Sequence, residues 1–161
     1  MKTNHQGNDA KFDVRQVVFE ENDQRKSSDI ATEVLWVVIP YTSPELTRAA
    51  LRHAAGCTDL HVHLHLVDIQ VVPFPCPLAE PPINREHSLR RLRALFCESR
   101  LPGRAAVLYT RDWLEGFRRV LEPGSLILIA TRKRWWPTRE EKLARSLTKA
   151  GHQVMLLPVM R

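Results

Sequence analysis

Cations and aromatic rings are concentrated in one short segment of the chain, residues 131–138. The segment reads Thr131-Arg132-Lys133-Arg134-Trp135-Trp136-Pro137-Thr138. Guanidinium and ammonium groups bind phosphates and carboxylates through charge-assisted hydrogen bonds, and a helix that starts at Thr138 would add an electropositive end. Indole rings can stack on a nucleotide base. The segment is therefore a candidate anion or nucleotide site. The alternative is a solvated basic turn with one tryptophan packed on the core and the other covering a neighbouring helix or a dimer partner.

Three histidines, His61, His63 and His65, alternate along an expected strand and therefore share one of its faces. Such spacing can chelate a metal ion. However, no Asp or Cys at ligand spacing completes a set, and a helix is expected to cover this face of an internal strand. We interpret the histidines as buried or helix-facing side chains satisfied by hydrogen bonds, and we assign no metal ligands.

Nucleophilic catalysis has no recognisable signature here. No Ser/His/Asp or Cys/His arrangement occurs at a suggestive spacing, so no catalytic residues are assigned and a binding protein is expected rather than an enzyme. The three cysteines, Cys57, Cys76 and Cys97, form no C-x-x-C pair and are odd in number. This pattern argues against both a disulfide framework and a structural zinc site.

The elements that would position these residues alternate between strands and helices. Residues 34–39 form a continuous apolar run, which is typical of a strand buried on both faces of a parallel sheet. Ser43, Pro44 and Glu45 then supply an N-cap, a first-turn proline and an early acid. Apolar residues follow at helical spacing, and we expect Gly56 to end this helix in a left-handed conformation.

The same alternation continues to the end of the chain. Further strands are predicted at residues 60–69, 105–109, 125–130 and 154–159, and further helices begin near Asn84, Asp112 and Thr138. On the helix after Asn84, Arg90, Arg91 and Arg93 are expected to face outward. Five strands and four helices in this order predict an α/β fold, a doubly wound parallel sheet. Ligands of such sheets bind outside the carboxyl ends of the strands, where the strand order reverses.

Composition divides the chain into two parts. Residues 1–30 are polar and nearly neutral, and they predict a disordered tail, with a short strand around residues 14–19 as the alternative. Residues 31–161 form the domain and carry the positive charge, 19 basic against 12 acidic residues. No signal peptide or membrane-spanning run is visible, so a cytoplasmic protein without membrane insertion is expected. A basic surface permits nucleic-acid binding, but exposed aromatics are not interleaved with the arginines, which makes that partner unlikely.

The opening of the domain resembles a universal stress protein. The likeness rests on the segments Val37-Val38-Ile39-Pro40-Tyr41-Thr42-Ser43-Pro44-Glu45-Leu46 and Arg48-Ala49-Ala50-Leu51-Arg52-His53-Ala54-Ala55, and on the order of the later elements. The resemblance implies an adenine-nucleotide alpha-hydrolase-like fold with strand order 3-2-1-4-5 and a crevice between strands 1 and 4. It also implies a homodimer through the last strand.

Two departures from the family's ATP-binding members concern this crevice. Where those members carry an aspartate at the end of strand 1, this chain has Tyr41, followed by Thr42 and Ser43. Their glycine-rich loop after strand 4 corresponds here to residues 131–138, which contain no glycine. Bulky side chains block the close approach of backbone N–H groups to phosphates. ATP is therefore disfavoured as a cofactor, although the fold would permit it.

The expected function is a non-catalytic regulatory or signalling module of universal-stress-protein type, with lost or altered nucleotide binding and a protein or transporter partner. A binder of nucleotides or other anions through the basic loop is the alternative, and a nucleic-acid-binding basic domain is the second alternative. The candidate site comprises the residues at the two strand ends: Tyr41, Thr42, Ser43, Thr131, Arg132, Lys133, Arg134, Trp135, Trp136 and Thr138.

Overall fold

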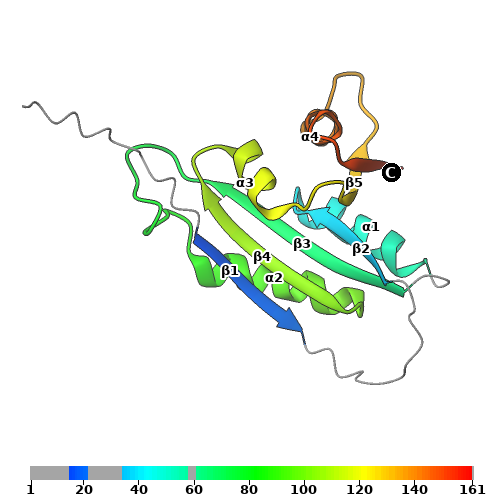
Figure 1. The fold of residues 1–161 in the computed structure, drawn as a ribbon, viewed down its shortest axis with the longest axis horizontal. Helices are drawn as coiled ribbons and strands as arrows, with labels where there is room; N and C mark the ends of the chain where they lie inside the picture. Colours follow the sequence, from blue (N-terminus) through cyan, green and yellow to red (C-terminus); the bar gives the residue numbers. More distant parts are fainter. Residues whose placement is uncertain (1–14, 22–33, 58–60, 161) are drawn as a thin grey trace, which may run out of the picture.

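A single six-stranded sheet organises the molecule (Figure 1). The computed structural model describes residues 15–21, 34–57 and 61–160. The strand order is β1-β4-β3-β2-β5-β6. The strands are β1 (Arg15–Glu21), β2 (Val34–Pro40), β3 (His61–Val71), β4 (Gly103–Thr110), β5 (Leu126–Arg132) and β6 (Gln153–Val159). Strands β2 to β6 are parallel, which confirms the predicted five-stranded order 3-2-1-4-5.

The first strand was only an alternative in the sequence analysis. β1 pairs antiparallel with β4 over its whole length, from Arg15 opposite Tyr109 to Glu21 opposite Gly103. Part of the segment expected to be a polar tail therefore adds an edge strand to the parallel sheet. The rest of that expected tail, residues 1–14 and 22–30, lies outside the described residues.

In the described part of the chain, four helices cover the sheet, and each begins at a polar N-cap. They are α1 (Pro44–Ala55), α2 (Arg85–Ser99), α3 (Trp113–Val120) and α4 (Arg139–Lys149). The side chains of Ser43, Asn84, Asp112 and Thr138 accept hydrogen bonds from first-turn N–H groups, as such caps do. Among the described helices, none is long and apolar enough to cross a membrane.

The first helix ends at Gly56 as predicted, but the predicted conformation of this residue is wrong. Gly56 ends α1 with φ −75°, a right-handed conformation, and its N–H bonds to carbonyls of the last turn without a left-handed cap. The left-handed C-cap belongs instead to Arg100 after α2, at φ 56°. The rule that glycine favours this conformation describes a preference, and hydrogen bonding can satisfy the last carbonyls without it.

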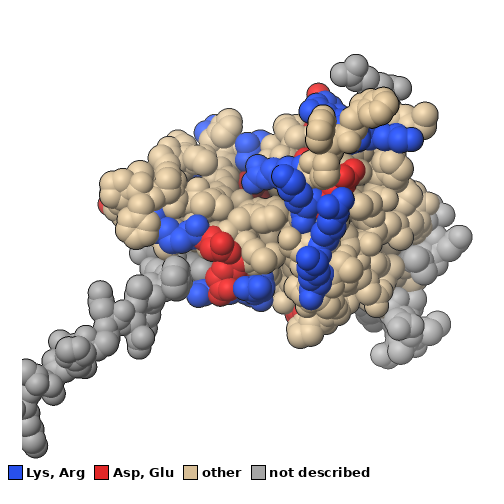
Figure 2. All heavy atoms as spheres, turned by 90° about the horizontal axis from the view of Figure 1, so that it is seen from above, with Lys and Arg blue, Asp and Glu red and all other residues tan. Residues whose placement is uncertain are grey.

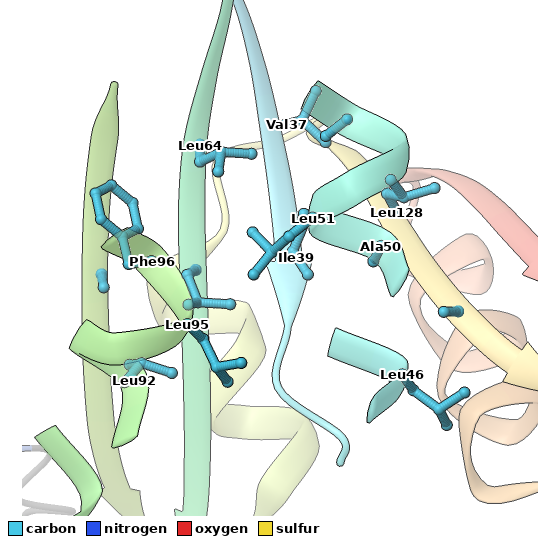
Figure 3. Close-up of a cluster of buried hydrophobic side chains, with 14 of the residues drawn as sticks. Val37, Ile39, Leu46, Ala50, Leu51, Leu64, Leu92, Leu95, Phe96 and Leu128 are labelled. Atoms are coloured by element: carbon cyan, nitrogen blue, oxygen red, sulfur yellow. The ribbon is translucent and has the colours of Figure 1, made fainter. Parts of the chain in front are cut away.

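The helices form two layers. α1 and α2 pack on one face of the sheet, where Ile39, Leu51, Leu64 and Phe96 belong to one buried apolar cluster (Figure 3). α3 and α4 pack on the other face, in a cluster that includes Phe117 and Leu143. Because the chain leaves β2 toward one layer and β5 toward the other, the strand order reverses between these two strands.

Candidate functional site

The carboxyl edge of the sheet opens between β2 and β5. These strands pair only at Val37 with Leu126 and at Val38 with Ile127, near the beginning of β5. Beyond this point β5 diverges from β2, as Figure 1 shows, and the two strands run on toward their carboxyl ends without pairing. The residues that follow β2 and β5 therefore flank the crevice that the topology predicts.

The residues after β2 are held by local hydrogen bonds. The Tyr41 N–H donates to the Val67 carbonyl at 2.7 Å. Ser43 Oγ accepts from the Leu46 N–H at 3.3 Å, and the Thr42 N–H donates to Thr47 Oγ1 at 3.3 Å. The last two hydrogen bonds hold the start of α1, and the first links the end of β2 to β3.

The basic loop after β5 has a tied neck and an exposed tip. Thr131 Oγ1 and Thr138 Oγ1 lie 3.0 Å apart and share a hydrogen bond, and Thr138 also forms a capping box with Glu141. At the tip, Trp135 is fully exposed and Trp136 is 83% exposed. Neither tryptophan packs on the described core. The solvated-turn interpretation expected one of them to do so, and that part of it is wrong.

An ion pair spans the crevice. Arg132 Nη2 contacts Glu45 Oε2, which joins the end of β5 to the first turn of α1. Both side chains are substantially exposed, so the pair contributes little to stability. The pair matters for the candidate anion site. Of its three cations, Arg132, Lys133 and Arg134, the first already has an acidic partner within the chain.

A buried polar network lies beside this crevice, under α2. Arg91 Nη2 donates to Asp68 Oδ2 at 3.0 Å, and its guanidinium carbon lies 4.3 Å from the centroid of the Tyr41 ring. Gln70 Nε2 donates to Asp68 at 2.9 Å and to Ser88 Oγ at 2.8 Å. The prediction that Arg91 faces outward is wrong, because a buried carboxylate in β3 holds it against the sheet.

Burial dominates the electrostatics of this network. It raises the pKa of Asp68, and this effect outweighs the opposing hydrogen bond from Gln70 and the charge of Arg91. Burial also raises the pKa of Tyr41 against the lowering effect of Arg91. The Asp68–Arg91 pair is thus a neutralised structural contact that ties Tyr41 in place.

Sequence reasoning missed Asp68, Gln70 and Arg91 as members of this site. Asp68 and Gln70 occupy the same face of β3 as Leu64 and Leu66, where the strand is otherwise apolar. Two polar residues at period two on a buried face are a usable signal, because buried polar groups need partners. Only the fold brings Tyr41 and Arg91 together.

The histidine interpretation is partly wrong. His65 is buried, but its Nε2 has no hydrogen-bond partner among the described residues, while His61 is exposed. α3 packs farther along this face, where Gly116 lies against Ile69 and Thr110, so no described helix covers His63 and His65. Over the described part of the chain, no group of His, Cys, Asp and Glu side chains is arranged to hold a metal ion.

Comparisons with known proteins support the fold and do not address the function. No protein-family model matches the chain, and no curated protein matches it in sequence. Among solved structures, a universal stress protein from Archaeoglobus fulgidus is similar, with a TM-score of 0.51 and 16% identity. The match covers 76% of this chain and 92% of that protein. At this identity the likeness shows a shared architecture, and the chain has a universal-stress-protein-like α/β fold.

Proposed function

We propose that this domain is a non-catalytic regulatory module of universal-stress-protein type that does not bind ATP in the manner of the family's ATP-binding members. The single observation that carries the proposal is the occupation of the crevice by the chain's own side chains. The Arg132–Glu45 ion pair spans it, and Tyr41, held by Arg91, stands at the end of β2.

The loop supports the same proposal. A phosphate cradle needs backbone N–H groups that a ligand can approach, which is why such loops are rich in glycine. Residues 131–138 contain none, and the Thr131–Thr138 hydrogen bond closes the neck of the loop. The module would act by contact with a partner, either a protein or a transporter, from the cytoplasm, and through a homodimer formed at β6.

A second candidate function follows from the tip of the loop. Lys133 and Arg134 are exposed next to two exposed tryptophans. Figure 2, seen from above the view of Figure 1, shows a band of Lys and Arg side chains across the middle of that face. The exposed cations and indole rings at the tip of the loop favour binding of an anionic ligand with a planar group, held by side chains alone.

One titration separates the two functions. We expect magnesium ATP at millimolar concentration to leave the melting temperature of the purified protein unchanged and acid extraction to release no nucleotide. A site filled to a hundredfold excess over its Kd would add about 2.7 kcal/mol, or roughly 5–10 °C. Co-purified ATP would overturn the proposal.

Two double variants identify the binding site behind any rise in melting temperature. A rise that is lost in Lys133→Glu/Arg134→Glu but kept in Arg145→Glu/Lys149→Glu, a matched charge reversal on α4, would establish the second function. A rise that both double variants keep would place ATP elsewhere in the crevice and contradict the leading proposal. Glu45→Gln, which frees Arg132, tests whether the ion pair alone excludes the nucleotide.

A further inference from the structure

A cavity of about 530 Å³ lies at the opposite, amino edge of the sheet, on the face that carries α3 and α4. Its lining includes Trp36 of β2, His65 of β3 and Arg104 of β4. The rest comes mainly from the segment that leads from α3 into β5, residues 120–126. This volume falls in the range of about 300–1,000 Å³ that is usual for small-molecule sites.

The cavity exists because α3 is short. It has eight residues and ends at Val120, and Gly116 fixes it over the carboxyl half of the strands, against Ile69 and Thr110. In Figure 1, α3 and α4 lie over the upper part of the sheet, and none of the drawn helices lies in front of its lower part. The amino half of this face is thus open to a ligand.

Two polar side chains occupy this open half where core residues would otherwise stand. His65 and Arg104 are register partners on neighbouring parallel strands, so their side chains lie next to each other. Farther along the same face, the strands carry buried apolar residues, among them Val67 and Ala106. The change from apolar to polar occurs where the helix cover ends.

The hydrogen bonds of this pair leave two N–H donors without an acceptor. Arg104 Nη2 lies 3.4 Å from His65 Nδ1. Arginine only donates, so Nδ1 is the acceptor and the neutral ring carries its proton on Nε2. His65 Nε2 and Arg104 Nε are both buried and have no partner among the described residues. Buried donors are nearly always paired, so this site lacks an acceptor.

The charge at the site points to an anionic acceptor. The ion pairs observed between described side chains do not include Arg104, although Glu20 of β1 is its register partner and Glu122 belongs to the cavity lining. The Arg104 charge and burial together lower the pKa of His65 to about 4, so the imidazole is neutral near pH 7 and serves as a donor. A carboxylate can accept charge-assisted hydrogen bonds from Arg104, whereas the His65 Nε2–H points away from Arg104, because Nδ1 is the nitrogen that faces the guanidinium.

The third member of the lining supplies an aromatic surface. Trp36 is 45% exposed, its ring centroid lies 5.3 Å from the Arg104 guanidinium carbon, and its ring meets His63 edge to face at 5.1 Å. A half-exposed indole in a cavity wall can stack on a planar group. Apolar neighbours, Leu35, Val38 and Leu126, complete a surface suited to a ring.

We propose that this cavity binds a small aromatic carboxylate, with its ring against Trp36 and its carboxylate on the Arg104 guanidinium. Arg104 Nε is shut off from solvent in the structure, so binding through it requires a side-chain rearrangement. Trp36, half exposed and adjacent to Arg104, can supply it. The site is at the opposite edge from the crevice, and it goes beyond the proposed regulatory function by giving the module a ligand.

Isothermal titration of the full chain with 1-naphthoate tests the proposal. We expect saturable binding, no comparable binding of 1-naphthamide, which lacks the charge, and none of inorganic phosphate, which lacks the ring. Arg104→Met should weaken 1-naphthoate binding at least tenfold. Arg132→Met should leave it unchanged, since Arg132 lies at the other edge. Absence of binding at 5 mM, or equal binding of the amide or of phosphate, would overturn the proposal.

A second measurement keeps the test independent of how the variants fold. In nitrogen-15 NMR spectra of the wild-type protein, 1-naphthoate should shift the His65 Nε2 resonance and the Trp36 indole N–H, and leave the indole signals of Trp135 and Trp136 in place. Shifts confined to Trp135 and Trp136 would assign the ligand to the basic loop and contradict the proposal for this cavity.

Discussion

At the scale of single residues, the chain places polar groups where the sheet is otherwise apolar, at both ends of the strands. Asp68 and Arg91 neutralise each other at the carboxyl edge, whereas His65 and Arg104 at the amino edge are both donors. Both clusters contain buried polar atoms without a partner among the described residues, Arg91 Nε and Gln70 Oε1 in the first and His65 Nε2 and Arg104 Nε in the second. A paired buried charge is a structural contact, while a cation in a cavity wall that is in none of the ion pairs observed between described side chains is a place for an anionic partner. This difference decides which of the two clusters carries a ligand proposal.

The buried imidazole of His65 should make stability depend on pH. Its pKa falls from 6.5 to about 4 on folding, chiefly because burial penalises the charged ring. Below pH 6.5 the unfolded chain takes up a proton that the folded protein does not bind until about pH 4. Stability is therefore lost as pH falls through this window and levels off below it, with a total of about 3 kcal/mol.

Urea unfolding of wild type and His65→Gln between pH 7 and pH 4 measures this contribution. The variant should lose less stability across the window. His53→Gln, which changes an exposed histidine of α1, should follow the wild-type curve. The comparison with wild type also cancels Asp68, whose raised pKa acts in the opposite direction, favouring the folded state as pH falls. Parallel curves for wild type and His65→Gln would contradict the assignment.

At the scale of elements, β4 begins with a close backbone contact that only glycine permits. Gly103 has φ +149°, and a Cβ at this position would lie 2.1 Å from the carbonyl oxygen of Leu64. Gly103→Ala should therefore cost roughly 2–4 kcal/mol, because both the conformation and the contact become unfavourable. The midpoint of urea unfolding, at constant slope, measures the loss.

Gly124→Ala is the matched control for this substitution. Gly124 also has positive φ, +74°, but nothing lies within 4 Å of an added Cβ. Its replacement should cost only about 1 kcal/mol, the conformational penalty alone. Equal losses in the two variants would mean that the contact with Leu64 has no energetic consequence.

Helix starts and buried strands were the most predictable elements, because their signals are local. Ser43, Asn84 and Thr138 each precede a helix that the structure confirms. The end of α1 at Gly56 is confirmed, but its predicted left-handed conformation was wrong, because a glycine does not dictate its own φ. β1 was left as an alternative because its pairing with β4 depends on a partner more than 80 residues away.

The candidate site was predictable only in its position. Both strand ends were located from the alternating pattern, but the Arg132–Glu45 ion pair and the contact of Arg91 with Tyr41 join residues of different elements. The cavity at the amino edge gave no local signal. It follows from the length of α3 and from the register that sets His65 beside Arg104.

At the scale of the whole molecule, the two edges of the sheet differ. β1 pairs with β4 and covers that side of the parallel sheet, while β6, at the other side, pairs with β5 alone among the described strands. β6 exposes Met155 and Leu156, at 51% and 41%. An apolar edge strand with free N–H and C=O groups is a natural site for pairing with a second copy.

Light scattering tests the homodimer that this edge favours. The wild-type protein should have twice the mass of one chain, and Met155→Lys/Leu156→Lys should reduce it to that of the monomer. Ile83→Lys, a charge placed on a residue of similar exposure in the segment before α2, should remain dimeric. A monomeric wild-type protein would refute the prediction, as would a dimer that tolerates both lysines.

The antiparallel strand β1 also sets the order in which the molecule can be completed during synthesis. Among the described strands its pairing is with β4 alone, so its ladder cannot form until residues 103–110 have left the ribosome. Chains grow from the N-terminus at about 5–20 residues per second, so β1 waits several seconds for its partner. Of the described strands, the one that is made first can thus pair only after β2 and β3, which are made later, can already pair with each other.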